Sequence, residues 1–313
     1  MSKLKGLLLT QGMHGMISQV EGLAKALDID FIHCEVETNN IWNIIPPRLS
    51  PISQSVYKKI DQTDFDLIIS CGRKSVIPSI FLKKNSKKKT INIHIQNPKI
   101  SLKNFDFVII PDHDGISGSN VINTKGAIHY LTNKEINDSK DYLLNKIEKN
   151  KDVITLVLGG PTKDYNYSND NMLDIFSKIN KRLKEYNLQL VIIPSNRTPK
   201  KTIQLAKEYF SEGCIVIDKV DKSAYLSSLA LAKYIIVTCD STSMISEAAL
   251  TGKPLYVAMI PPLRNDTRFE KFRNLFERLN IIKKLEDKLE TWNYEKLNEA
   301  DRIASEIKKK INQ

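Results

Sequence analysis

Short apolar runs alternate with helix-like segments along the whole chain, and this alternation restricts the folds that it can adopt. In the first half, KGLLLTQ, DFIHCEVE, FDLIISCG, TINIHIQ and FDFVIIPD have the Ile, Leu and Val content of buried strands. The order restarts with DVITLVLGG and continues through LQLVIIPSN, KYIIVTCD and KPLYVAMI, with helices expected between these runs. This pattern predicts an α/β chain with two Rossmann-like, doubly wound parallel-sheet domains that face a cleft.

The length of 313 residues suits two domains better than one or three. Because the strand pattern restarts near Asn150 and Lys151, we expect an N-terminal domain over residues 1–150 and a C-terminal domain over residues 151–292. The remaining residues, 293–313, are expected to form a last helix that packs back on the N-terminal domain.

The net charge of +11 comes almost entirely from Lys, since Arg occurs only nine times. Without a finger, an RNP motif or a basic zipper, this charge does not predict a nucleic-acid partner. The run LKKNSKKKT at residues 82–90 can lie against anionic phospholipid, but a solvated loop between a helix and a strand is the simpler explanation. No apolar run approaches the roughly 18 residues of a spanning helix. We expect a cytoplasmic protein whose membrane contact, if any, is peripheral to the inner membrane.

Ligands of parallel sheets bind beyond the carboxyl ends of the strands, where helices begin. In the N-terminal half, Gly12 and Gly15 would let a ligand approach the backbone, His14 would act as a base or a phosphate contact, and Gln19 lies one turn into the helix. The alternative is a plain glycine turn with an exposed histidine. Arg73 and Lys74 would hold a negatively charged substrate, and further polar contacts are expected from Gln96, Asn97 and His113.

Two cofactor classes are not indicated by these residues. The spacing of Gly12 and Gly15 is G-x-x-G instead of the G-x-G-x-x-G of nicotinamide-binding turns. His113 lies between two aspartates, but neighbours on an extended chain point in opposite directions and no H-x-x-x-H pair completes a metal site. We therefore expect neither a metal nor another cofactor.

In the C-terminal half, Gly159 and Gly160 follow a strand and would leave room for a diphosphate, while Arg197 would pair with phosphate oxygens. Free N–H groups are expected at a helix start formed by Ser241, Thr242 and Ser243, and these groups would face an anion. Glu247 would accept hydrogen bonds from the vicinal hydroxyls of a ribose. A serine nucleophile is not supported, because there is no G-x-S-x-G elbow and no histidine after His129.

The ordered motifs QGMHGMISQVEGLAKAL, SCGRKS, HIQNPK, PDHD, NTKGAIH, LGG, SNRTP and CDSTSMISEAALTGKPLYV resemble the mitochondrial-fission Elm-type family over most of residues 1–285. That family is similar to the GT-B glycosyltransferases, including the peptidoglycan N-acetylglucosaminyltransferase. The resemblance implies a ribose contact for Glu247, a diphosphate contact for Ser241 to Ser243, and a catalytic or acceptor-side role for His14.

These observations together predict a metal-independent glycosyltransferase of GT-B type. Its donor would be a nucleotide-diphosphate sugar. The acceptor would belong to cell-envelope glycan or glycolipid synthesis, and a lipid-linked molecule is one candidate. Two alternatives remain open from the sequence. One is a nucleotide-sugar epimerase on the same fold, and the other is a non-catalytic scaffold recruited to a membrane, because the plant founder of the family is a fission factor.

Overall fold

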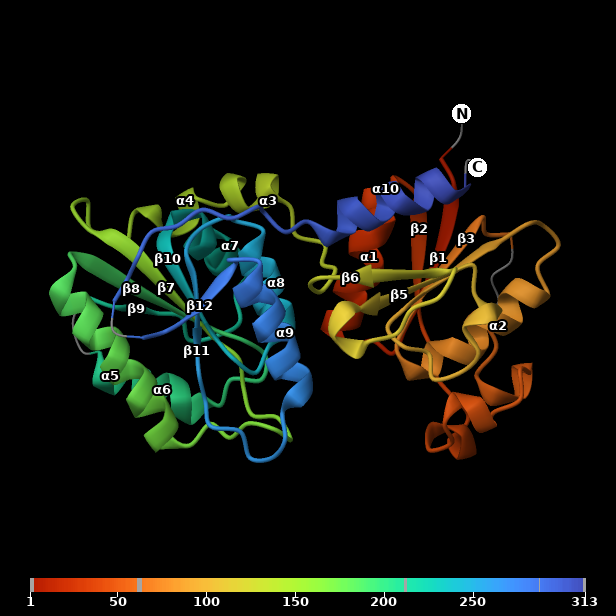
Figure 1. Ribbon diagram of the computed structural model, residues 1–313, viewed down its shortest axis with the longest axis horizontal. Coiled ribbons are helices and arrows are strands. Elements are labelled where there is room, and N and C mark those ends of the chain that lie inside the picture. Colours follow the sequence, from red (N-terminus) through yellow and green to blue (C-terminus); the bar gives the residue numbers. More distant parts are fainter. Residues whose placement is uncertain (1–2, 61–63, 211–212, 287, 312–313) are drawn as a thin grey trace. The chain divides into compact units, whose positions relative to one another are not determined.

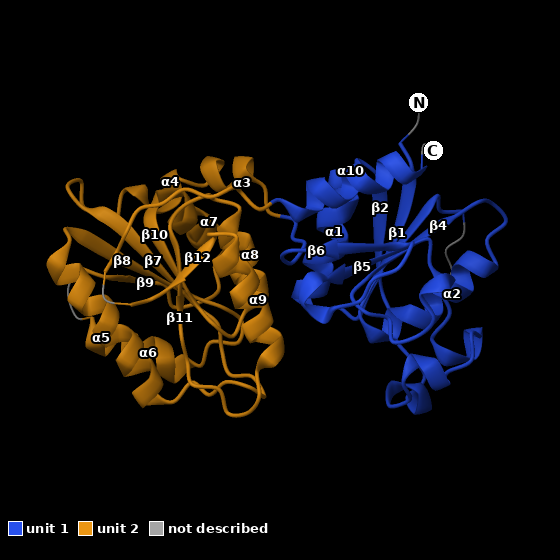
Figure 2. Cartoon of the chain, viewed as in Figure 1, with its two compact units in different colours: residues 1–130, 298–313 blue, residues 131–297 orange. Residues whose placement is uncertain are grey.

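The computed structural model describes residues 3–60, 64–210, 213–286 and 288–311, which form two compact units (Figure 1). Unit 1 comprises Met1–Tyr130 and Asn298–Gln313, and unit 2 comprises Leu131–Leu297 (Figure 2). The boundary expected at Asn150 lies inside unit 2. The residues just before it form two short helices, α3 (Asn133–Asp138) and α4 (Asp141–Leu144), which pack against α7 (Lys222–Leu231) of the same unit.

Unit 1 is built on a parallel sheet of six strands in the order β2-β1-β3-β4-β5-β6. The strands are β1 (Lys5–Thr10), β2 (Asp30–Glu35), β3 (Leu67–Cys71), β4 (Ile91–Ile95), β5 (Phe107–Pro111) and β6 (Val121–Thr124). The longer helices are α1 (His14–Leu27), α2 (Val76–Lys84) and α10 (Glu299–Ile311). α10 lies beside α1, and its Ile303, Ala304 and Ile307 join the core formed by α1 and the sheet (Figure 1).

Unit 2 contains the second parallel sheet, in the order β12-β11-β10-β7-β8-β9. Its strands are β7 (Asp152–Leu158), β8 (Leu188–Pro194), β9 (Ile215–Val216), β10 (Ala232–Thr238), β11 (Leu255–Ala258) and β12 (Ile282–Lys284). Besides α7, its helices are α5 (Asn169–Glu185), α6 (Lys200–Tyr209), α8 (Thr242–Ala249) and α9 (Thr267–Arg278). The central strands are buried on both faces, which explains why their sequences are continuous apolar runs. The predicted α/β class with two Rossmann-like domains is confirmed.

Each sheet has a point where the strand order reverses, and that point locates the candidate sites. In unit 1 the chain runs from β1 to β2 on one side and then continues with β3 on the other side of β1. In unit 2 it builds β8 and β9 on one side of β7 and then β10 on the other. Loops that leave neighbouring strands in opposite directions open a crevice at their carboxyl ends, where ligands bind in folds of this kind.

Among the described residues, no helix is both long enough and apolar enough to span a lipid bilayer.

Candidate functional site

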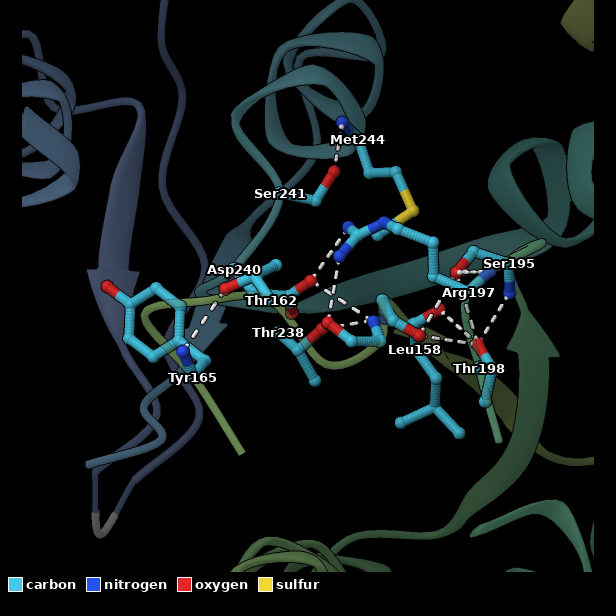
Figure 3. Close-up of polar contacts among 12 residues, drawn as sticks. Leu158, Thr162, Tyr165, Ser195, Arg197, Thr198, Thr238, Asp240, Ser241 and Met244 are labelled. Atoms are coloured by element: carbon cyan, nitrogen blue, oxygen red, sulfur yellow. Dashed lines mark hydrogen bonds and ion pairs between the residues drawn. The ribbon is translucent and has the colours of Figure 1, made fainter. Parts of the chain in front are cut away.

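A buried carboxylate, Asp240, lies at the reversal point of unit 2, just beyond the end of β10 (Figure 3). Its Oδ2 accepts hydrogen bonds from the Gly160 N–H at 3.1 Å and from Arg197 Nη2 at 2.8 Å. Its Oδ1 accepts one from the Tyr167 hydroxyl at 2.5 Å. A buried charge is costly unless it is paired and hydrogen-bonded, and Asp240 meets both conditions. Sequence reasoning missed this residue because an aspartate after a strand is also an ordinary cap or turn residue.

The two glycines after β7 make room for Asp240 and for the chain at Arg197. A Cβ at Gly159 would collide with the Asp240 carboxylate, and a Cβ at Gly160 would collide with the backbone of Arg197. Both N–H groups are already used, because Gly159 donates to Thr238 Oγ1 at 2.8 Å and Gly160 donates to Asp240. The two glycines therefore have a structural reason in the packing of Asp240 and Arg197, and a diphosphate contact at this loop stays a prediction.

Arg197 connects the loops that follow β7 and β8, and its side chain stays partly exposed. Nη1 donates to the Gly160 carbonyl at 2.8 Å, and Nη2 donates to Asp240 (Figure 3). The side chain is 41% exposed. Because a guanidinium carries five N–H donors, these two contacts leave donors for a ligand. The structure places Arg197 at the reversal point, as expected, and shows in addition that it neutralises a buried anion.

The helix α8 begins beside this cluster. Ser241 is its N-cap and accepts a hydrogen bond from the Met244 N–H at 3.3 Å. Thr242 and Ser243 form the first turn and are partly exposed. N–H groups in the first turn have no partner within their own helix, and the helix dipole makes this end positive. The helix start, with Arg197 close to it in Figure 3, is suited to hold an anion.

Glu247 follows on the same helix, and its carboxyl group is partly buried. Its Oε2 accepts a hydrogen bond from the Tyr225 hydroxyl of α7 at 2.8 Å. Burial raises the pKa of Glu247 to about 7, and the hydrogen bond from Tyr225 offsets only part of this rise. The carboxyl group thus loses its proton near neutral pH, which is unusual for a glutamate and typical of groups at functional sites.

The end of the long motif, GKP at residues 252–254, has a structural explanation. Gly252 has a φ of +72°, a conformation that favours glycine. Lys253 Nζ donates to the carbonyls of Leu229 at 2.8 Å and Ala230 at 2.6 Å, which caps the carboxyl end of α7. Burial lowers the pKa of Lys253 to about 8. This part of the motif holds α7, which carries Tyr225, in place next to α8.

A set of contacts that the sequence did not indicate joins the loops after β7 and β11. Arg264 Nε pairs with Asp164 at 2.6 Å, and the Leu263 N–H donates to the Asp164 carbonyl at 2.7 Å. Next to them, the buried Arg273 of α9 donates to the Tyr165 hydroxyl at 2.9 Å and pairs with Asp266 at 2.8 Å. These contacts hold the loops after β7 and β11 together and fix them to α9. Pairs a hundred residues apart leave no periodic signal in a single sequence.

In unit 1, His14 is the first residue of α1 and is exposed, with Nε2 at 3.4 Å from the Tyr130 hydroxyl. Gly12 has a φ of +77°, and a Cβ there would overlap the Glu35 carboxylate. Gly15 has open space around its α-carbon. The Gln19 side chain donates to the Gly15 carbonyl at 3.0 Å. The glycine loop therefore leaves His14 accessible at the carboxyl end of β1.

The other candidates of unit 1 follow the neighbouring strands β3, β4 and β5. Arg73 is exposed, but its guanidinium donates to the carbonyls of Asn43 and Ile45, so it already has a structural role beside Lys74. Asn97 accepts a hydrogen bond from the Lys99 N–H at 3.0 Å, and its neighbour Gln96 has a φ of +83°.

His113 follows β5 and lies in the 3-10 turn η6 (Asp112–Asp114), with only 6% of its side chain exposed. The edge of this sheet thus holds His14, Arg73, Lys74, Gln96, Asn97 and His113. Within the described ranges, no group of three or more His, Cys, Asp or Glu side chains is arranged to hold a metal ion.

The chain has two Rossmann-like units, each with candidate site residues at the carboxyl ends of its parallel strands. This is the architecture of the GT-B fold. Solved structures share this fold. The UDP-GlcNAc 2-epimerase of Methanocaldococcus jannaschii is 15% identical with a TM-score of 0.55, covering 97% of this chain and 99% of that one. The MurG of Acinetobacter baumannii is 9% identical with a TM-score of 0.50, covering 99% of this chain and 91% of that one. At these identities the likeness shows the fold alone.

The chain belongs to the mitochondrial fission ELM1 family, whose sequence profile matches residues 14–311. An uncharacterised protein of Rickettsia prowazekii (strain Madrid E) is 27% identical over 287 residues, which cover 80% of each chain. The mitochondrial fission protein ELM1 of Arabidopsis thaliana is 22% identical over 274 residues, covering 78% of this chain and 64% of the plant protein. The resemblance carried by the sequence motifs is confirmed.

Proposed function

We propose that this protein is a nucleotide-sugar-dependent glycosyltransferase of GT-B type that binds the nucleotide at the carboxyl edge of the unit 2 sheet. One observation carries the proposal: the partly exposed start of α8 directly follows Asp240, which pairs with Arg197 at the reversal point of the sheet, and Glu247 lies on the same helix. Thr242 and Glu247 are separated by roughly 8 Å along the helix axis. This spacing suits a ligand with an anionic group at one end and hydroxyls at the other, as in a nucleoside diphosphate.

The roles of the residues follow from their chemistry. The N–H groups of Thr242 and Ser243 bind the diphosphate, and Arg197 offsets the charge that grows on it as it leaves. Glu247 accepts hydrogen bonds from the ribose hydroxyls. In unit 1, the exposed His14 removes a proton from the acceptor hydroxyl. No step requires a protein nucleophile or a metal ion, and the acceptor is bound by unit 1.

A nucleotide-sugar epimerase is the second candidate, since solved UDP-GlcNAc 2-epimerases share the fold over nearly the whole chain. The two enzymes differ in one requirement. An epimerase converts its sugar nucleotide without an acceptor, whereas a transferase releases the nucleotide only when an acceptor or water receives the sugar. A scaffold protein would do neither.

Calorimetry against UDP-, GDP-, CMP- and ADP-sugars is the first experiment, and we expect one of them to bind. Glu247→Ala removes a hydrogen bond to a charged group, worth roughly 1.5–3 kcal/mol, and should weaken binding about ten- to a hundredfold. Glu208→Ala, at an exposed position on α6, is the matched control. Equal binding by the parent and Glu247→Ala would disprove the ribose role, and binding of none of the four would favour a scaffold. Chromatography of the bound nucleotide with and without acceptor then separates transferase from epimerase.

A further inference from the structure

The chain between β2 and β3 extends beyond the carboxyl end of β2. It contains the 3-10 helices η1 (Asn40–Asn43), η2 (Pro47–Leu49) and η3 (Gln54–Val56), the orange-red turns at the lower end of unit 1 in Figure 1. We call residues 40–50 the apolar segment. Because β2 ends at Glu35, this segment lies at the same edge of the sheet as the loop that carries His14.

Three large aliphatic side chains of the apolar segment point into solvent. Ile41 is 67% exposed, Ile44 is 85% exposed and Leu49 is 67% exposed. A 3-10 helix has three residues per turn, so Ile41 in η1 and Ile44, the C-cap residue of η1, lie on the same side of the turn. Single exposed aliphatic residues are ordinary, but several together on one short segment mark an interaction surface.

Hydrogen bonds to neighbouring residues hold the apolar segment in place. Arg73 donates to the carbonyls of Asn43 and Ile45, and the Thr38 hydroxyl donates to Asn43 Oδ1 at 2.5 Å. The Asn39 N–H donates to the Val56 carbonyl at 3.0 Å, which links the chain before the apolar segment to the chain after it. The fold therefore fixes Ile41 and Ile44 in an outward position by specific hydrogen bonds.

Three cations lie within the apolar segment or beside it. Arg48 is exposed next to Leu49, and Arg73 and Lys74 border a recess that is also lined by Trp42 and Pro47. That recess has a volume of only about 10 Å³, room for one water molecule and not for an acyl chain. An apolar layer with an anionic surface fits a segment that combines exposed aliphatic side chains with neighbouring cations.

We propose that the apolar segment docks on an anionic lipid bilayer, with Ile41, Ile44 and Leu49 inserted among the acyl chains. Arg48, Arg73 and Lys74 then lie at the level of the lipid phosphates. The Lys-rich run at residues 82–90 contributes less, because Lys83 pairs with Asp106 at 2.6 Å and Lys88 pairs with Asp66 at 2.9 Å. The proposal does not depend on the reaction proposed above.

Vesicle co-sedimentation tests the proposal directly. The full chain should sediment with vesicles of phosphatidylcholine and phosphatidylglycerol, less with phosphatidylcholine alone, and less again at high salt. Ile41→Ser combined with Ile44→Ser should lower the partition coefficient roughly ten- to a hundredfold, since each inserted aliphatic side chain favours the bilayer about tenfold or more. Ile32→Ser, at a position on β2 that is 51% exposed, is the control and should bind as the parent does. Equal binding by parent and double variant would overturn the proposal, as would no binding of the parent.

Fluorescence gives a second measurement that leaves the apolar side chains intact. The protein has two tryptophans, Trp42 inside the apolar segment and Trp292 in unit 2. In a Trp292→Phe chain, lipids with brominated acyl chains should quench the remaining emission and shift it to shorter wavelength. Binding without quenching would show that another surface contacts the lipid. A dimer in size-exclusion chromatography that Ile41→Ser with Ile44→Ser separates, without any vesicle binding, would instead assign the surface to a second copy of the chain.

Discussion

The Glu247 carboxyl should destabilise unit 2 at neutral and alkaline pH, and Glu247→Gln should remove this cost. Burial raises the pKa of this group from 4.5 to about 7. At about 1.4 kcal/mol per pKa unit, the difference corresponds to roughly 3 kcal/mol. The sign follows from proton binding, because between these two pKa values the folded chain holds a proton that the unfolded chain has lost. The stability of the parent therefore falls as the pH rises from 4.5 to 7 and stays low above 7.

Thermal unfolding of the parent and Glu247→Gln at two pH values tests this reasoning. Gln keeps an oxygen that can accept the hydrogen bond of the Tyr225 hydroxyl, so the substitution removes the charge and little else. At pH 8 we expect Glu247→Gln to be more stable by up to about 3 kcal/mol, which corresponds to a rise in Tm of several degrees for a unit of this size. At pH 5 the gain should fall below about 1 kcal/mol.

The matched control is Glu208→Gln, at an exposed position on α6, which should change Tm little at either pH. The same gain at pH 5 and pH 8 would show that the effect comes from packing and not from ionisation. A loss of stability at pH 8 would refute the argument altogether. Glu247→Gln should also bind nucleotide less tightly, so that a gain in stability accompanies a loss of function, a trade-off common at binding sites.

Three further predictions concern the residues around this helix start and the glycine loop. Arg197→Ala leaves the buried Asp240 without its cation and should lower the free energy of unfolding in urea by about 3–5 kcal/mol. Adding Asp240→Asn should recover most of this stability, and equal stability of the single and double variants would refute the pairing. Gly160→Ala should destabilise unit 2 strongly in the same assay, because its Cβ meets the backbone of Arg197. Gly15→Ala, in open space on α1, should instead raise the free energy of unfolding by up to about 1 kcal/mol. Similar effects at both positions would contradict this explanation. His14→Ala should abolish sugar transfer while leaving the Tm and the calorimetric affinity for the sugar nucleotide unchanged, and full transfer activity in this variant would remove His14 from the mechanism.

The strand pattern predicted the fold well because buried parallel strands leave continuous apolar runs such as LQLVIIP. The sequence also shows the glycines at positions 159 and 160, but it does not show why glycine is needed there. Gly159 is required by the carboxylate of Asp240, which lies about eighty residues later in the chain, and Gly160 is required by the backbone of Arg197. Since Asp240 is close to Gly160 only through the pairing of β7 and β10, a single sequence holds no local signal of that contact.

The boundary between the units was harder to predict for a related reason. The restart of the strand pattern near Asn150 assigned all residues before it to the first domain, but the structure places α3 and α4 in unit 2. Both pack on α7, and Leu143 N–H donates to Ser227 Oγ at 3.0 Å. Amphipathic pattern predicts that a helix has a buried face, but not which unit covers it.

The return of α10 to unit 1 has a consequence for the order in which the chain folds during synthesis. Unit 1 is interrupted by the whole of unit 2, and its core includes Ile303, Ala304 and Ile307 of α10, which is translated after unit 2. All residues of unit 2 leave the ribosome before those of α10 do, so unit 2 can fold while unit 1 still has an uncovered face on α1. The apolar face on α1 of the nascent first unit therefore stays uncovered until α10 has left the ribosome.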